Sequence, residues 1–167
     1  MKQLFSQKQI DIQTKIVAKQ INDNHRGDIT PVVFIGLLNG CFMFYSDLVK
    51  NITFDIECDF MRVKSYIGKK QGDIQILKDI ETPIKGKHIY LIDDILDSGN
   101  TMNTVIEYLK VKQPNSISIA TLLTRETSPL PQVPSYHAFT IKDEWVIGMG
   151  MDDNKGYKRN YPIILEV

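Results

Sequence analysis

The segment from Ile89 to Thr101, which reads IYLIDDILDSGNT, constrains the fold of this chain more than any other. The β-branched and apolar run Ile89–Ile92 is typical of a buried strand, and it stops at two adjacent carboxylates. Small and polar residues then lead into Met102–Leu109, whose apolar spacing is typical of an amphipathic helix. The order predicts a strand, an acidic loop at its carboxyl end, and a turn at a helix start.

This turn carries the groups of an anion-binding site. Three carboxylates precede or enter it, namely Asp93, Asp94 and Asp97, and four small or polar residues complete it, namely Ser98, Gly99, Asn100 and Thr101. Backbone N–H groups at a helix start, with hydroxyls beside them, bind anions, and nearby acids suit a ligand with hydroxyls as well as a phosphate, such as ribose 5-phosphate. The alternative is a solvated turn, because the same residue types form turns and caps without any ligand. Ile95 and Leu96 favour the site, since they indicate a tightly packed loop.

Length and composition predict one domain, residues 1–167, that folds without a metal or a disulfide. Twenty basic and twenty acidic residues give zero formal charge, which is unlike a general nucleic-acid binder. No signal peptide and no membrane-spanning run is visible, so we expect a cytoplasmic protein with neither nucleic-acid nor membrane partners.

The cysteines and histidines carry no metal-site signature. Cys41 and Cys58 lie in apolar surroundings, which predicts two buried free thiols. His25, His88 and His137 are far apart in the sequence and lack ligand-like spacing, so we expect all three to face solvent.

Alternating strand and helix patterns predict an α/β domain with a mostly parallel central sheet flanked by helices. Ser6 is expected to cap a helix that ends near Asn24, and a second helix is expected at 42–49. The remaining expected strands are 31–38, 53–63, 74–77, 116–123, 136–141, 145–149 and 163–167. Ligands of such sheets bind outside the carboxyl ends of the strands.

The segment Ile89–Thr101 resembles the phosphoribosyl pyrophosphate (PRPP) signature of the type I phosphoribosyltransferases, and the Asp97-Ser98-Gly99 version is similar to the hypoxanthine(-guanine) branch. The likeness extends from Val32 to Pro162. It implies a small hood formed by the terminal segments, and transfer of the phosphoribosyl group from PRPP to N9 of hypoxanthine or guanine. It also implies Mg²⁺ as cofactor, a role in purine salvage, and a homodimer or homotetramer.

The resemblance assigns roles within the signature. Asp97, Ser98, Gly99, Asn100 and Thr101 would bind the 5′-phosphate, and Asp97 would also act as the general base that takes the proton from purine N7. Asp93 and Asp94 would bind the ribose hydroxyls and a Mg²⁺ ion.

Pyrophosphate would be bound by the loop that contains Leu38, Asn39 and Gly40, often with a cis peptide at Leu38–Asn39. Relatives usually carry Lys or Arg where Asn39 stands, so Lys69 or Lys70 is a possible substitute. Without the resemblance, an ordinary strand-to-helix turn is the simpler interpretation. Arg159 would help to hold pyrophosphate, with Lys158 as a rival.

Ser65 and Tyr66 resemble the start of the family's catalytic lid, and an ordinary surface loop is the alternative. Arg125 stands where relatives carry a Lys that contacts the purine 6-oxo group; the alternative is an exposed surface residue. Trp145 would stack on the base, Val146 would offer backbone groups to it, and Asp152 would contribute to the base site and bind a second Mg²⁺. Alone, Trp145 would be interpreted as a core residue.

Two other functions remain open from the sequence. One is a phosphoribosyltransferase for xanthine or another base. The other is a PRPP-sensing regulator that binds nucleic acid, against which the neutral charge and the lack of a helix-turn-helix extension argue.

Overall fold

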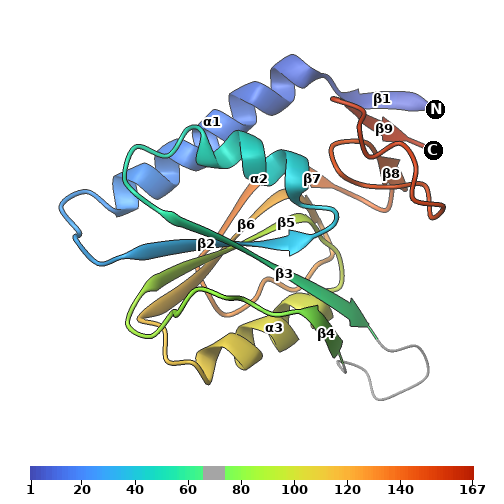
Figure 1. Cartoon of the computed structure of the whole chain (residues 1–167). Helices are drawn as coiled ribbons and strands as arrows, with labels where there is room; N and C mark the ends of the chain where they lie inside the picture. The colour runs from blue at the N-terminus through green and yellow to red at the C-terminus, as the bar shows by residue number, and fades with distance from the viewer. Residues whose placement is uncertain (66–73) are drawn as a thin grey trace.

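The computed structural model describes residues 1–65 and 74–167, and these residues form a six-stranded sheet, a three-stranded sheet and three helices (Figure 1). The elements are β1 (Lys2–Phe5), α1 (Gln7–Asn24), β2 (Val32–Leu38), α2 (Phe42–Val49), β3 (Glu57–Ser65), β4 (Ile74–Lys78), β5 (His88–Leu96), α3 (Asn100–Lys110), β6 (Ser116–Arg125), β7 (Ser135–Ile141), β8 (Val146–Ile147) and β9 (Ile164–Glu166).

The large sheet has the strand order β4-β3-β2-β5-β6-β7. All of its neighbours pair in parallel except β3 and β4, which are antiparallel. The predicted α/β class with a mostly parallel central sheet is therefore confirmed. Strand β5 lies in the interior of the sheet, between β2 and β6, and its carboxyl end is the place where ligands of such sheets bind.

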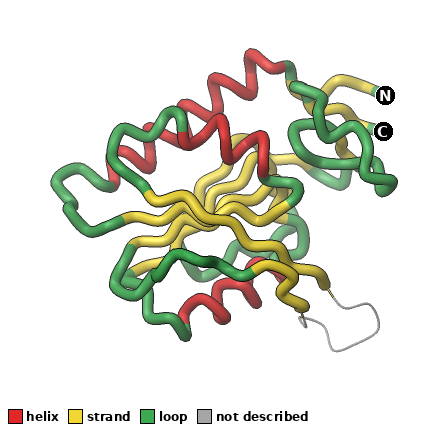
Figure 2. The backbone as a smooth tube through the Cα atoms, in the orientation of Figure 1, coloured by secondary structure: helices red, strands yellow, loops and turns green. Residues whose placement is uncertain are grey.

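The sheet is covered on both faces. Helices α1 and α2 lie on one face and α3 lies on the other (Figures 1 and 2). Side chains of a strand alternate between the faces, so Phe34 joins the core cluster of α1 and α2, whereas Ile35 joins the cluster of α3. Both side chains are fully buried. This double cover explains why β2 reads as a continuous apolar run.

The ends of the chain form the small antiparallel sheet, in the order β1-β9-β8. Lys2 pairs with Glu166, so the two termini lie side by side (Figure 1). We call this sheet, together with the loop from Gly148 to Ile163, the hood. It matches the hood that the resemblance predicts, although β1 itself was not among the expected strands.

Several boundaries differ from the predictions. Strand β5 does not stop before the acidic pair but runs through it to Leu96, and β3 begins at Glu57 rather than near Thr53. Cys41 is buried as expected, whereas Cys58 is exposed. The residues from Tyr66 to 73, and with them most of the predicted lid, lie outside the described residues.

The prediction of solvent-facing histidines is wrong for two of the three. His25 and His88 are half-buried and lie close together, and His137 is exposed. Among the described residues, no helix is long and apolar enough to cross a membrane.

Helix α1 begins with a capping box, because the Ser6 hydroxyl accepts from the Gln9 amide while the Gln9 side chain accepts from the Ser6 amide. We expect Ser6→Ala to lower the free energy of unfolding by about 1 kcal/mol. Calorimetry should then show a melting temperature about 2 to 4 °C lower. The matched control is Gln20→Ala, at an exposed position inside α1 itself, which should change stability by less than about 0.5 kcal/mol. Equal effects of the two substitutions would contradict the capping role.

Candidate active site

The acidic pair lies within β5, near its carboxyl end. Asp93 faces Thr121 of β6 in the strand register, and pairing continues beyond it to Leu96. The Asp94 amide donates to Asp93 Oδ1 at 2.9 Å, and the Ile95 amide donates to Asp94 Oδ1 at 2.8 Å. The two carboxylates are therefore fixed by the sheet rather than carried on a loop.

Both carboxylates resist ionisation. Burial raises the pKa of Asp93 well above its ordinary value, and the negative charge of Asp94 raises it further. Burial also raises the pKa of Asp94, which hydrogen bonds and the positive charge of Arg159 partly oppose. Among the described residues, neither carboxylate forms an ion pair with a Lys or Arg side chain. Such a pair binds a cation favourably, because the cation neutralises charge that the fold itself leaves uncompensated.

The turn from β5 to α3 forms a small cradle. Gly99 is the N-cap of α3 with a φ of 77°, a conformation that suits glycine, and it offers no side chain to the first-turn N–H groups. A cavity of about 170 Å³ opens here. It is lined by Asp93, Ile95, Leu96, Asp97, Ser98, Gly99, Thr101 and Met102. The predicted 5′-phosphate residues are thus brought together, except that Asn100 does not line this cavity.

The sequence did not predict that Ser128 and Pro129 contact this turn. The Ser128 hydroxyl donates to the carbonyl oxygen of Leu96 at 2.8 Å and also to that of Asp97. A Cβ added at Gly99 would lie 3.1 Å from the Pro129 carbonyl oxygen. The Ser-Pro pair after β6 was the available signal, since it marks a turn at the same sheet edge.

A second cavity, of about 180 Å³, lies between the acidic strand and the hood. It is lined by Asp94, Ile95, Asp97, Arg125, Trp145, Val146, Met151, Asp152 and Asn154. The four predicted base-binding residues are all among them, and Trp145 is half exposed at 51%. Met151 and Asn154 had not been predicted. Asp97 lines this cavity as well as the cradle, so one carboxylate faces both.

Arg125 is held by three hydrogen bonds rather than extended into solvent. Its Nε donates to Asp97 Oδ1 at 2.6 Å, and Nη1 donates to the carbonyl oxygens of Lys142 and Glu144 at 2.9 and 3.2 Å. Only Nη2 has no partner among the described residues. A guanidinium has several N–H donors in one plane, so Arg125 can hold the loop before Trp145 and still have Nη2 available to donate. A Lys ammonium could not make the same set of bonds with this geometry.

The loop after β2 lies against both the acidic pair and the hood. The peptide bond Leu38–Asn39 is cis, as the resemblance implies. A Cβ at Gly40 would lie 1.9 Å from Asp94 Oδ2, and one at Gly150 would lie 1.9 Å from the Gly40 carbonyl oxygen. Both positions therefore require glycine, and no side chain fits between these three segments. The Asn39 residue is exposed, and its proposed substitutes Lys69 and Lys70 lie outside the described residues.

Within the hood, the two candidate pyrophosphate ligands Arg159 and Lys158 have different ion-pair partners. Arg159 pairs with Asp152 at 3.1 Å and donates to the Gly150 carbonyl oxygen at 2.6 Å. Lys158 instead pairs with Asp153 at 3.6 Å. Arg159 is the one whose charge acts on the acidic pair, so the geometry favours it over Lys158.

Comparison with known proteins agrees with this arrangement. Residues 1–154 match the family model described as "Phosphoribosyl transferase domain". The hypoxanthine phosphoribosyltransferase of Escherichia coli is 37% identical over 154 residues, which is 90% of this chain and 86% of that protein. The chain belongs to the hypoxanthine(-guanine) phosphoribosyltransferase family.

Solved structures support the same membership. A hypoxanthine-guanine phosphoribosyltransferase from Bacillus anthracis has a TM-score of 0.91 and 32% identity, and the alignment covers 100% of this chain and 98% of that one. A hypoxanthine phosphoribosyltransferase from Trypanosoma cruzi, in complex with the product IMP, has a TM-score of 0.91 and 30% identity, with 99% and 93% of the two chains covered.

The raised pKa of Asp93 predicts that ionisation of its carboxylate lowers the free energy of unfolding. The folded chain holds this proton more tightly than the unfolded chain does, so the stabilisation is present at low pH and is lost as the pH rises through the folded-state pKa. We expect Asp93→Asn, which keeps an oxygen for the Asp94 amide, to raise the free energy of unfolding at pH 8 by about 1 kcal/mol or more.

Denaturant unfolding between pH 5 and pH 8 measures this effect. Asp11→Asn is the matched control, because Asp11 is exposed on α1 and should give no such pH-dependent gain. A destabilised Asp93→Asn protein would contradict the assignment.

Proposed function

We propose that this chain transfers the 5-phosphoribosyl group from PRPP to N9 of hypoxanthine or guanine, releasing pyrophosphate and forming IMP or GMP, as a step of purine salvage. The observation that carries the proposal is the position of Asp97, which lines both the phosphate cradle and the cavity beside Trp145. A purine nucleotide needs these two pockets side by side. The names of the relatives and the IMP complex of the Trypanosoma cruzi protein support the same reaction.

The sugar and its phosphate would lie along the end of β5. Ser98, Gly99, Asn100 and Thr101 bind the 5′-phosphate through N–H groups and hydroxyls at the start of α3. Asp93 and Asp94 bind the ribose hydroxyls, and their negative charge favours the electron-poor sugar of the transition state. The loop with Leu38 and Asn39 would bind pyrophosphate beside the bond that breaks, and the close approach of Gly40 to Asp94 supports this role.

Mg²⁺ fits this donor set. It prefers carboxylate and other hard oxygen ligands, and Asp93 and Asp94 present half-buried carboxylates that form no ion pair among the described residues. Asp152, whose carboxylate is oriented by Arg159, would hold a second ion. Bound Mg²⁺ supplies charge neutralisation for the pyrophosphate leaving group.

The base would lie in the cavity beside Trp145. The purine ring stacks on Trp145, Val146 offers backbone groups to the edge of the purine, and Arg125 donates from Nη2 to the 6-oxo group. Asp97 accepts the N7 proton as general base. Arg125 Nε, 2.6 Å from Asp97 Oδ1, holds that carboxylate in a fixed orientation.

The reaction is tested by offering the purified protein PRPP, Mg²⁺ and one base at a time. We expect pyrophosphate release and a nucleoside 5′-monophosphate with hypoxanthine or guanine, and little with adenine. Activity with xanthine alone would support the alternative base. Absence of pyrophosphate release with every base would refute the proposal.

Asp97→Asn separates the chemical step from binding. Asn keeps an oxygen for Arg125 but cannot take a proton, so turnover should fall about 10² to 10⁴ fold, while the KM for PRPP changes less than about threefold. Initial rates at varied PRPP and base measure both constants. Asp11→Asn is the control and should match the unmodified protein. Unchanged turnover in Asp97→Asn would exclude the base assignment.

We also propose a cytoplasmic homodimer or homotetramer. An apolar surface depression formed by α2 and the neighbouring strands supports a subunit contact there; it is lined by Leu38, Phe42, Tyr45, Ser46, Val49 and Phe60. Light scattering during size-exclusion chromatography should give a mass of two or four chains. A mass of one chain at micromolar concentration would contradict this.

A further inference from the structure

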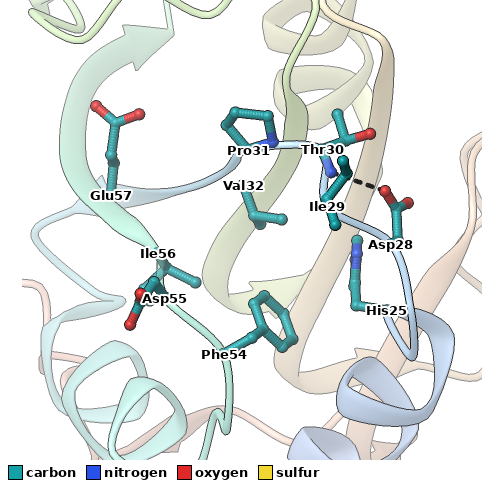
Figure 3. Close-up of a pocket in the computed structure, with 10 residues that line it drawn as sticks. All are labelled: His25, Asp28, Ile29, Thr30, Pro31, Val32, Phe54, Asp55, Ile56 and Glu57. Atoms are coloured by element: carbon teal, nitrogen blue, oxygen red, sulfur yellow. Dashed lines mark hydrogen bonds between the residues drawn. The ribbon is translucent and has the colours of Figure 1, made fainter.

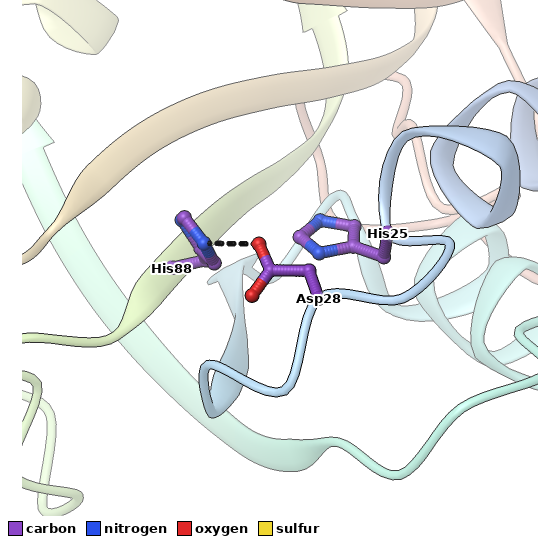
Figure 4. Close-up of side chains that lie close together, drawn as sticks. All are labelled: His25, Asp28 and His88. Carbon is purple, nitrogen blue, oxygen red and sulfur yellow. Dashed lines mark hydrogen bonds and ion pairs between the residues drawn. The ribbon is translucent and has the colours of Figure 1, made fainter.

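Three potential metal ligands meet at the amino end of β5, away from the active site (Figure 4). They are His25, which caps the carboxyl end of α1, Asp28 in the following loop, and His88, the first residue of β5. One ligand atom of each lies within 4.8 Å of those of the other two. The three are separated by up to 63 residues in sequence, counted from His25 to His88, so spacing alone did not reveal them.

His88 is oriented from both sides. Its Nδ1 lies 2.6 Å from the Ser116 hydroxyl, and its Nε2 lies 2.9 Å from Asp28 Oδ2. The other oxygen of Asp28 accepts from the Thr30 amide at 2.8 Å. Ligating histidines in proteins are commonly oriented in this way, by a hydrogen bond to the ring nitrogen that does not bind the metal.

His25 has an unsatisfied nitrogen. Its Nε2 lies 2.7 Å from the Tyr90 hydroxyl, whereas Nδ1 is buried and has no hydrogen-bond partner among the described residues. A buried polar atom without a partner destabilises the folded protein, and a bound ligand would remove that cost. The ring of His25 therefore has a nitrogen that no protein group satisfies among the described residues.

We propose that His25, Asp28 and His88 bind a divalent transition-metal ion, with Zn²⁺ as the expected occupant. Two imidazoles and one carboxylate match the ligands of Zn²⁺, whereas Mg²⁺ favours oxygen ligands alone. Tetrahedral ligands about 2.0 to 2.1 Å from Zn²⁺ lie roughly 3.3 Å apart. The 2.9 Å between His88 Nε2 and Asp28 Oδ2 therefore has to widen by only a few tenths of an ångström.

A fourth ligand can reach this site through an adjoining cavity of about 370 Å³. Figure 3 shows His25 and Asp28 on one side of that cavity, with Asp55 and Glu57 across from them. Three protein ligands with access to solvent leave one coordination position for water or a small anion.

The site lies at the opposite end of β5 from the catalytic acids. His88 precedes Asp93 by five residues, which is roughly 16 Å along a strand. The metal would join the end of α1 and the loop that follows it to the first residue of the central strand, so its role is structural rather than catalytic.

The test is a calorimetric titration of the tag-free, chelator-treated protein with Zn²⁺, in buffer with excess Mg²⁺ to occupy the catalytic carboxylates. We expect one Zn²⁺ per chain, and a melting temperature about 5 to 10 °C higher at 100 times the dissociation constant. His25→Gln and His88→Gln should each weaken binding at least about tenfold, with phosphoribosyl transfer in Mg²⁺ alone retained as evidence of folding.

Three control variants test other side chains that could bind Zn²⁺. His137→Gln removes the exposed histidine, Cys58→Ser the exposed thiol and Asp94→Asn an active-site carboxylate, and each should keep the Zn²⁺ site. Wild-type histidine NMR signals give an independent result, since Zn²⁺ should shift those of His25 and His88 but not that of His137. Absence of Zn²⁺ binding, or equal binding after His25→Gln and His88→Gln, would overturn the proposal and leave a hydrogen-bonded cluster only.

Discussion

The pairing of β5 between β2 and β6 is the constraint on which the rest of the structure depends. The strand enters the sheet at His88 and leaves it at Leu96, and its second half carries two carboxylates that burial makes costly to ionise. Apolar residues from Ile89 to Ile92 fill both core clusters and hold the strand in place against that cost. The sheet is therefore the element that keeps the acidic pair in its position.

Around this strand, three loops from distant parts of the chain meet at close range. The approach of Gly40 to Asp94 and of Gly150 to Gly40 leaves no room for side chains, so the loop after β2, the acidic strand and the hood form one contiguous surface. Arg125 adds a polar link, since it contacts Asp97 and the backbone before Trp145. Arg125 therefore supports the geometry of the site by holding Asp97 and the loop before Trp145.

Much of this was predictable because its signals are local. The capping box at Ser6, the helix over Phe42–Val49 and the small-residue turn before α3 are all encoded within a few residues. The predictions that failed concern contacts between residues far apart in the sequence. The extension of β5 past Asp93 depends on pairing with β6, and β1 is a strand only because the far end of the chain lies beside it. The contact between His25 and His88 likewise depends on sheet topology, which sequence spacing does not reveal.

The strand β9 is the middle strand of the hood, and it consists of residues at the extreme end of the chain. It joins β1 to β8, which carries Val146 of the cavity beside Trp145. Strands β2 to β7 of the large sheet all lie between β1 and β8 along the chain, so the hood joins two segments that the large sheet separates in sequence. Without β9, the six strands of the large sheet would keep their partners, whereas β1 and β8 would have no strand between them and the cavity beside Trp145 would lose its support on that side.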